Sequence, residues 1–122
     1  MRVAVSLVLA FSAVVFCRPV HAARYALIAA NNRGWASEVP LQFAHDDGTR
    51  LATVLKEIGG FKGHNLLILR DATPQSIEAG LKRLSARMHA NPDPGGQDLL
   101  FFYYSGHADE KALHPGDLTP QN

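Results

Sequence analysis

Residues 98–109 read DLLFFYYSGHAD, and this stretch decides the fold. One acidic residue is followed by six consecutive apolar or aromatic residues, and then Ser105 and Gly106 lead directly to His107. An unbroken apolar run of this length predicts a strand that is buried on both faces, as in a parallel sheet. Ligands and catalytic groups of open α/β sheets gather at the carboxyl ends of the strands, so His107 is the first candidate functional residue.

Two more apolar runs, residues 24–30 and 65–70, also predict buried strands. Between them, from Phe43 to Ile58, the apolar residues recur with a helical period, and Gly59-Gly60 ends that helix. A second helical pattern runs to Met88, with Thr73 at the N-cap and Pro74 at the first helical position. The order strand-helix-strand-helix-strand predicts an α/β fold with a parallel sheet and right-handed crossovers.

The first 22 residues predict a secretory signal peptide. Arg2 precedes 14 uncharged, mostly apolar residues, and Val20-His21-Ala22 offers small residues for cleavage after Ala22. A membrane span needs about 20 apolar residues, and residues 17–19 (CRP) interrupt this run, so no stable membrane anchor is expected. The mature domain is then residues 23–122, and its expected location is periplasmic or extracellular.

The composition and the motifs argue against three classes of function: nucleic-acid binding, cofactor binding and metal binding. The 122 residues carry a net charge of +1, which does not favour a nucleic-acid partner. We expect no cofactor, because no glycine-rich phosphate loop follows the first strand. We expect no metal site either, and the four histidines without metal-ligand spacing are predicted to be exposed; they are His45, His64, His89 and His114.

Taken in order, these segments resemble caspase-like and metacaspase-like cysteine peptidases from about Arg24 to Asp109. YALIAANN at 25–32 is similar to the opening strand of the family, and LQFAHDDG at 41–48 is similar to its first helix. LRDAT at 69–73 matches the second strand and helix, and the SGH turn at 105–107 is the most specific element. The resemblance implies a three-layer αβα caspase-type fold, of which the chain is expected to hold the N-terminal portion, incomplete at the C-terminus.

The resemblance also implies roles for three residues in a cysteine-type endopeptidase that acts on a peptide or protein substrate. His107 would be the histidine of a Cys–His dyad, which activates a thiol and then protonates the leaving amine. The N–H of Gly106 would help to hold the oxyanion. Asp47 falls where metacaspase-like members place an acidic pocket residue, so a basic substrate residue is expected.

The chain departs from the family pattern at three places. Ala108 replaces the usual glycine after the histidine, and Leu41 stands near the position of the arginine with which true caspases read an acidic substrate residue. The nucleophilic cysteine is expected about 50 residues after the histidine, yet only 15 residues follow His107 and none is cysteine. The sole cysteine, Cys17, precedes the domain. The chain is therefore expected to carry the histidine half of the dyad and to be inactive alone.

Two other functions remain open from the sequence. The chain could be a non-catalytic caspase-fold module that binds or regulates a partner, or an unrelated α/β domain of flavodoxin-like order that binds a small ligand at the strand ends. At the residue level, His107 could be an ordinary surface-turn histidine. Asp47 could simply interact favourably with the helix dipole in a first turn.

Overall fold

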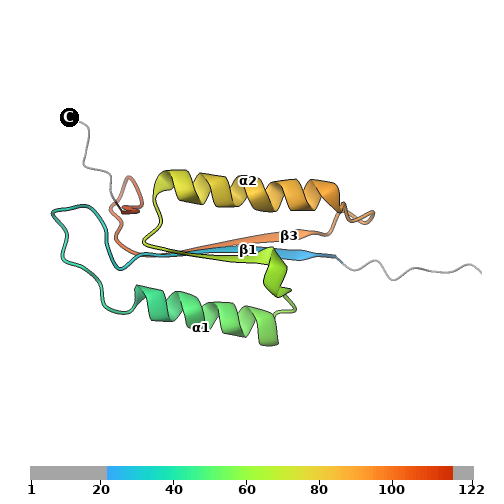
Figure 1. The fold of residues 1–122 in the computed structure, drawn as a ribbon, viewed down its shortest axis with the longest axis horizontal. Helices are drawn as coiled ribbons and strands as arrows, with labels where there is room; N and C mark the ends of the chain where they lie inside the picture. Colours follow the sequence, from blue (N-terminus) through green and yellow to red (C-terminus); the bar gives the residue numbers. More distant parts are fainter. Residues whose placement is uncertain (1–21, 117–122) are drawn as a thin grey trace, which may run out of the picture.

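The computed structural model describes residues 22–116, which form a three-layer α/β sandwich (Figure 1). Helices α1 and α2 cover opposite faces of one sheet. The predicted signal peptide, apart from Ala22, lies outside the described residues. The elements in chain order are β1 (Arg24–Ala30), α1 (Ala44–Glu57), the short 3-10 helix η1 (Gly63–Asn65), β2 (Leu66–Arg70), α2 (Pro74–Ala90) and β3 (Leu99–Ser105).

The sheet has the strand order β2-β1-β3, and both pairings are parallel. Ala26 lies opposite Leu66 on one side, and Arg24 lies opposite Leu99 on the other. The chain therefore leaves β1 in one direction and then crosses back over it. Right-handed crossovers made in opposite directions place their helices on opposite faces. This explains why α1 and α2 form the two outer layers and confirms the predicted αβα arrangement.

The core is built around β1. Its residues from Tyr25 to Ala30 are at most 2% exposed, and Leu27 packs with Leu84 of α2. Gly80 lets α2 approach the sheet closely, because a Cβ there would lie 2.6 Å from a methyl carbon of Leu27. The most deeply buried strand is thus the central one, because it is flanked by a strand on each side and covered by a helix on each face (Figure 1).

The residues at the ends of α1 and α2 explain where these helices begin and end. The side-chain oxygen of Thr73 accepts a hydrogen bond from the N–H of Ser76, and Pro74 occupies the first turn of α2, as predicted. Helix α1 begins after Phe43 without a side-chain cap, but two carboxylates lie in its first turn. Gly60 follows the end of α1 with φ of 71°, a left-handed conformation that glycine adopts without strain.

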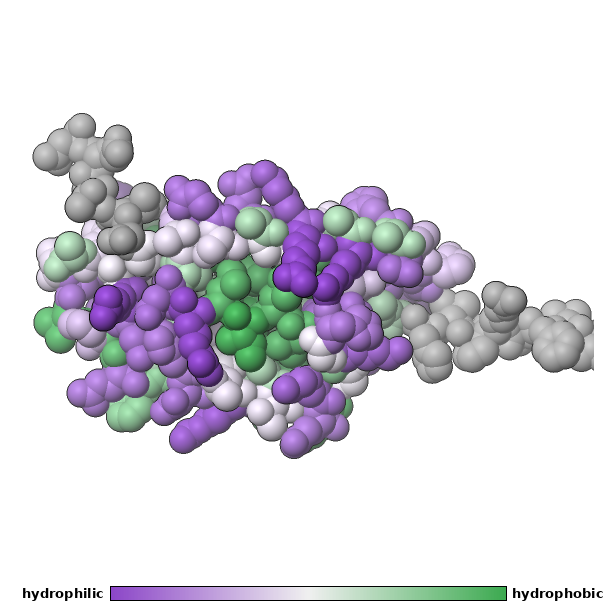
Figure 2. All heavy atoms as spheres, viewed as in Figure 1, coloured by the Kyte–Doolittle hydropathy of each residue, from purple (hydrophilic) through white to green (hydrophobic). Residues whose placement is uncertain are grey.

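The prediction that the flanking strands are buried on both faces was wrong. Leu99, Leu100 and Phe102 of β3 are 40–48% exposed, and Ile68 of β2 is 38% exposed. Both strands lie at the edges of the sheet, where two helices packed over the centre leave them partly uncovered. Figure 2 shows hydrophobic side chains exposed between the two helices, over the strand that follows η1. Within residues 22–116, no helix has the length and apolar character needed to cross a bilayer.

Candidate functional site

The candidate site lies at the carboxyl ends of the strands. The loop after β1 (residues 31–43) and the segment after β3 (residues 106–116) leave neighbouring strands and meet at this end of the sheet. The connection after β1 runs to β2 on one side, and the connection after β2 returns across β1 to β3 on the other side, which makes the gap between β1 and β3 the topological switch point. Ligand crevices of open α/β sheets form at such points.

His107 lies at this switch point, two residues after the end of β3. Its Nε2–H donates a hydrogen bond to the carbonyl oxygen of Val39 at 2.9 Å. A carbonyl can only accept, so Nε2 carries a proton, and in the neutral form of the ring Nδ1 keeps its lone pair. Nδ1 has no hydrogen-bond partner among the described residues, and a carboxylate oxygen of Glu38 lies 4.0 Å away. The ring is therefore oriented and retains one nitrogen that can accept a proton.

Gly106 is packed directly against an aromatic ring. A Cβ on Gly106 would lie 2.5 Å from the hydroxyl oxygen of Tyr104, so a side chain there would require the Tyr104 ring to move. That hydroxyl donates a hydrogen bond to the carbonyl of His107 at 3.0 Å. Burial, followed by the negative charge of Glu38, raises the pKa of Tyr104, so the phenol keeps its proton. Glycine is thus needed at 106 for close approach, which holds the turn that carries His107.

Asp47 lies in the first turn of α1 and is exposed. Its helical neighbours Ala44 and Gly48 face the sheet, while His45 points to the carboxyl end of β2. No hydrogen bond or ion pair links the side chain of Asp47 to His107 among the described residues. The structure thus does not bring these two predicted site residues together.

Asp71 is a site residue that the sequence interpretation did not single out. Its carboxylate accepts hydrogen bonds from the N–H groups of Asn32 and Arg33 and from Nε2 of His45. Partial burial acts to raise the pKa of Asp71, but these hydrogen bonds outweigh it and hold the pKa below its usual value. Asp71 directly follows β2, so the rule that functional groups collect at strand ends would have found it.

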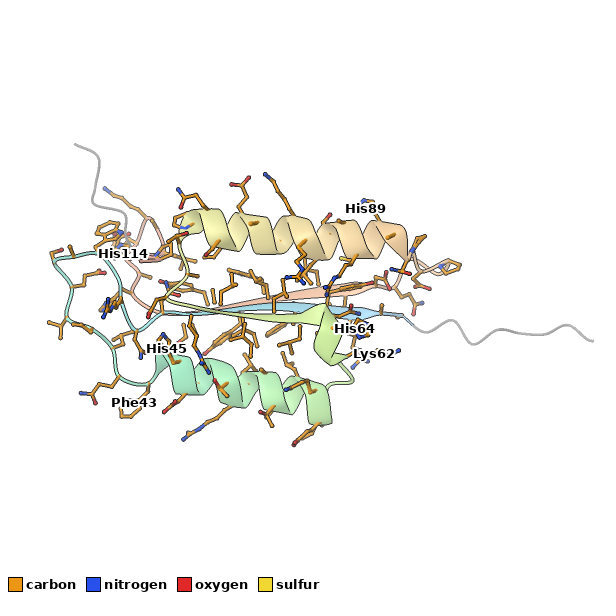
Figure 3. The ribbon with its side chains drawn as sticks, in the orientation of Figure 1. Phe43, His45, Lys62, His64, His89 and His114 are labelled. Atoms are coloured by element: carbon orange, nitrogen blue, oxygen red, sulfur yellow. The ribbon has the colours of Figure 1, made fainter. Side chains whose placement is uncertain are left out.

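The prediction that His114 is exposed was wrong. Its side chain is only 6% exposed and lies between two carboxylates, with Nδ1 2.5 Å from Glu38 and Nε2 3.1 Å from Asp109. The ring also stacks on Trp35, with centroids 3.6 Å apart. In Figure 3, His45 and His114 lie at the same end of the sheet, while His64 and His89 lie toward the other end. The segment around His114 is short and rich in turn residues, so it contains no periodic hydrophobic pattern that would predict this burial.

Asn31 connects the segments at the carboxyl ends of the three strands through hydrogen bonds. It is fully buried, its side-chain amide donates to the carbonyl of Ala72, and its side-chain oxygen accepts from the N–H of Ala72, both at 2.8 Å. Its own backbone N–H donates to the carbonyl of Ser105 at 2.7 Å. One residue therefore connects the ends of all three strands, which fixes the frame on which His107 sits.

A cavity of about 370 Å³ opens beside this frame. It combines an aromatic wall with two carboxylates and one guanidinium, a mixture suited to a polar or peptide ligand. The residues that line it are Arg33, Gly34, Trp35, Ala36, Glu38, Pro40, Asp71, Thr73 and Gly116. In the described part of the chain, no group of three or more histidine, cysteine, aspartate or glutamate side chains is arranged to hold a metal ion.

Comparison with known proteins adds one finding. Residues 23–121 match a peptidase family model described as the caspase domain. The match spans the whole described sheet, both helices and the His107 turn. No curated protein matches the chain at a significant level.

Proposed function

Because the chain belongs to the caspase-domain family of peptidases, we propose that it carries the histidine of a Cys–His dyad for peptide-bond hydrolysis, and that His107 has this role. The observation that supports the proposal best is the hydrogen bond from His107 Nε2–H to the Val39 carbonyl. It orients the ring at the end of the strand and leaves Nδ1 able to take a proton.

In this mechanism Nδ1 of His107 removes the proton of a cysteine thiol, and the thiolate attacks the carbonyl carbon of the scissile peptide bond. The C–N bond then breaks, His107 returns the proton to the leaving amine, and an acyl-enzyme remains. Water subsequently hydrolyses the thioester. The only cysteine of the 122 residues is Cys17, which precedes β1. The proposal therefore assigns the attacking thiol to polypeptide other than residues 22–116.

We assign the oxyanion contact to the turn beside His107. The N–H of Gly106 makes no hydrogen bond within residues 22–116, so it is available to the oxygen that becomes negative during attack. A backbone donor held in place by packing needs no reorganisation when the charge develops. The packing of Gly106 on Tyr104 supplies that rigidity.

We propose Asp47 as the residue that favours a basic substrate side chain, since it is an exposed carboxylate at the same end of the fold as His107. Charge-assisted contacts of this kind contribute roughly 1.5–3 kcal/mol. In a form that carries the thiol, Asp47→Ala should lower kcat/KM for arginine peptides by about one to two orders of magnitude. Asp46→Ala is the matched control, because Asp46 is also exposed in the first turn of α1. A preference for aspartate peptides in the unmutated protein would refute the assignment.

The main test compares two proteins. The first is the chain as printed, and the second extends it through the codons that follow Asn122 in its gene. We expect thiol-dependent cleavage of fluorogenic peptides by the extended protein alone, lost in His107→Ala and retained in His89→Ala, since His89 is exposed on α2. Cleavage by the printed chain that survives His107→Ala would contradict the dyad. No cleavage by the extended protein, with its fold intact, would favour a non-catalytic caspase-fold module that binds a partner.

A further inference from the structure

Four titratable side chains gather where the loop after β1 meets the segment after β3. They are Glu38, His107, Asp109 and His114. The Oε1 atom of Glu38 lies 2.5 Å from Nδ1 of His114 and 4.0 Å from Nδ1 of His107. The opposite nitrogen of His114 lies 3.1 Å from Asp109. Nε2 of His114 makes no hydrogen bond of acceptable geometry among the described residues, so its contact with Asp109 is an ion pair.

An imidazole placed between two carboxylates needs a proton on each nitrogen. A neutral ring has a single N–H, so one nitrogen lone pair would face a carboxylate in a buried position, which is unfavourable. The hydrogen bond with Glu38 raises the pKa of His114, and Asp109 adds to this, while burial opposes it. The pKa of Glu38 is lowered in turn, because the hydrogen bonds from His114 and Trp35 outweigh its partial burial. The surroundings of His114 therefore favour its imidazolium form.

This cation is linked to His107 through two routes. The backbone N–H of His114 donates to the carbonyl of His107 at 2.8 Å, so its position fixes the backbone of the turn. The side chain of His114 also holds Glu38, whose next residue in the chain is Val39, the acceptor for His107 Nε2–H. The backbone contact thus holds the turn that carries His107, while the side-chain bridge of His114 acts on the carbonyl that orients the His107 ring.

We propose that His114, as an imidazolium that bridges Glu38 and Asp109, is a positioning residue for His107, and that loss of its proton frees His107 from the Val39 carbonyl. The catalytic meaning of this positioning rests on the proposed function, whereas the positioning itself can be measured on the chain alone. Within residues 22–116, the charged groups that face His114 are Glu38 and Asp109, while His107 and Tyr104 lie near Glu38. His107 is held at low pH and released as the pH rises through the pKa of His114.

Trp35 is a built-in reporter, because it is the only tryptophan of the chain and stacks on His114 at 14°. A protonated imidazole quenches a stacked indole more strongly than a neutral one. Tryptophan fluorescence should therefore rise with pH, with a midpoint above the ordinary histidine value of 6.5. Glu38→Gln should move this midpoint down by about one pH unit, because it removes the opposite charge. Glu57→Gln, an exposed position near the end of α1, is the control and should leave it unchanged.

The second measurement reports on His107 itself. Nitrogen NMR of the ring shows whether Nε2 of His107 carries a proton and measures the rate at which that proton exchanges with water. We expect this proton to exchange roughly tenfold faster in His114→Gln, the factor for loss of one hydrogen bond of ordinary strength. In the unmutated chain an acceleration beyond the ordinary base-catalysed increase with pH, as measured on His89, should appear across the midpoint seen by Trp35. His89→Gln should have no effect. Asp109→Asn removes the charge that faces His114 but keeps an oxygen that can accept from the N–H groups of Lys111 and Ala112. It should give a smaller change, and it is the second variant if His114→Gln does not fold.

Two results would overturn the inference. One is a Trp35 midpoint at or below the ordinary histidine value. The other is a folded His114→Gln or Asp109→Asn variant in which the Nε2 proton of His107 exchanges as slowly as in the unmutated chain. Neither result bears on the proposed Cys–His dyad, because the peptide assay of His107→Ala tests that proposal separately. Conversely, an inactive extended protein would leave the measured link between His114 and His107 intact.

Discussion

The carbonyl oxygen of Val39 and the Nε2 of His107 lie 2.9 Å apart, although 68 positions separate them in the sequence. This contact joins the loop after β1 to the turn after β3 across the switch point of the sheet. A backbone carbonyl is an effective orienting group here, because its position depends on the path of the loop and not on a side-chain rotamer. Any change that displaces the loop should therefore alter the orientation of the His107 imidazole.

Gly34 offers a direct way to displace the loop. A Cβ there would collide with Glu38 and would lie 2.7 Å from Cδ2 of His107. Gly34→Ala should destabilise the protein by about 1–3 kcal/mol, the usual cost of overpacking, and should shift the ring resonances of His107. Gly63→Ala is the matched control, because a Cβ at that position meets nothing within 4 Å. Urea unfolding and histidine NMR are the measurements, and equal effects of both variants would contradict the packing argument.

Asn31 should be among the most sensitive polar positions. Asn31→Ala removes both hydrogen bonds to Ala72 and leaves two backbone groups unpaired in the interior. We expect a loss of about 2–4 kcal/mol in the free energy of unfolding, since each buried unsatisfied group costs about 1–3 kcal/mol. Asn91→Ala, at an exposed helix end, should cost less than about 1 kcal/mol. A similar midpoint of urea unfolding for the two variants would show that the Asn31 tie is not needed.

Asp71 should make stability depend on pH in the acid range. Its pKa is lowered in the folded protein, so its contribution is complete above the usual value of 3.8 and is lost as the pH falls through the folded-state pKa. Asp71→Asn tolerates the positive φ of 48° and still accepts N–H bonds, but it carries no charge. The stability gap between the unmutated protein and this variant should therefore be largest near pH 7 and shrink by pH 3. A gap that stays constant over this range would show that the charge contributes nothing.

The exposed side chains of β3 predict a measurable surface property. Leu99, Leu100 and Phe102 are each at least 40% exposed on one strand, and within residues 22–116 this strand pairs only with β1. An isolated chain should bind a hydrophobic dye such as ANS and associate at micromolar concentration. Phe102→Thr should reduce both effects more than Phe43→Thr, although Phe43 is the more exposed ring at 66%. A clean monomer with no dye binding would contradict this.

The sequence predicted the sheet and the helices because their signals are local. The apolar run before His107, the Thr73 cap and the Gly59-Gly60 stop each act within a few residues, and each was confirmed. The exposure of the edge strands was missed, because an apolar run shows that a strand is hydrophobic and not how far the helices reach across it. Edge position is a property of the whole sheet.

The candidate site could be predicted only in part. His107 follows from its place after an apolar strand, and Asp71 could have been found by the same rule. The contact of Glu38 with His114 joins residues 76 positions apart on two irregular segments. Nothing in either segment indicates its partner, because the path of each loop is set by packing on Trp35 and by the hydrogen bonds of Asn31 and Asp71. The roles of His107, Gly106 and Asp47 in catalysis stay predictions.

The central position of β1 has a consequence for biosynthesis. β1 is the first strand to leave the ribosome, yet its partners begin at Leu66 and Leu99. At about 5–20 residues per second, roughly 4–15 s pass between the synthesis of Arg24 and that of Leu99. During this interval the central strand has an incomplete set of neighbours, and its residues 25–30, which are nearly inaccessible in the finished fold, face water. The pace of translation through residues 31–105 therefore sets how long the nascent protein is vulnerable to aggregation.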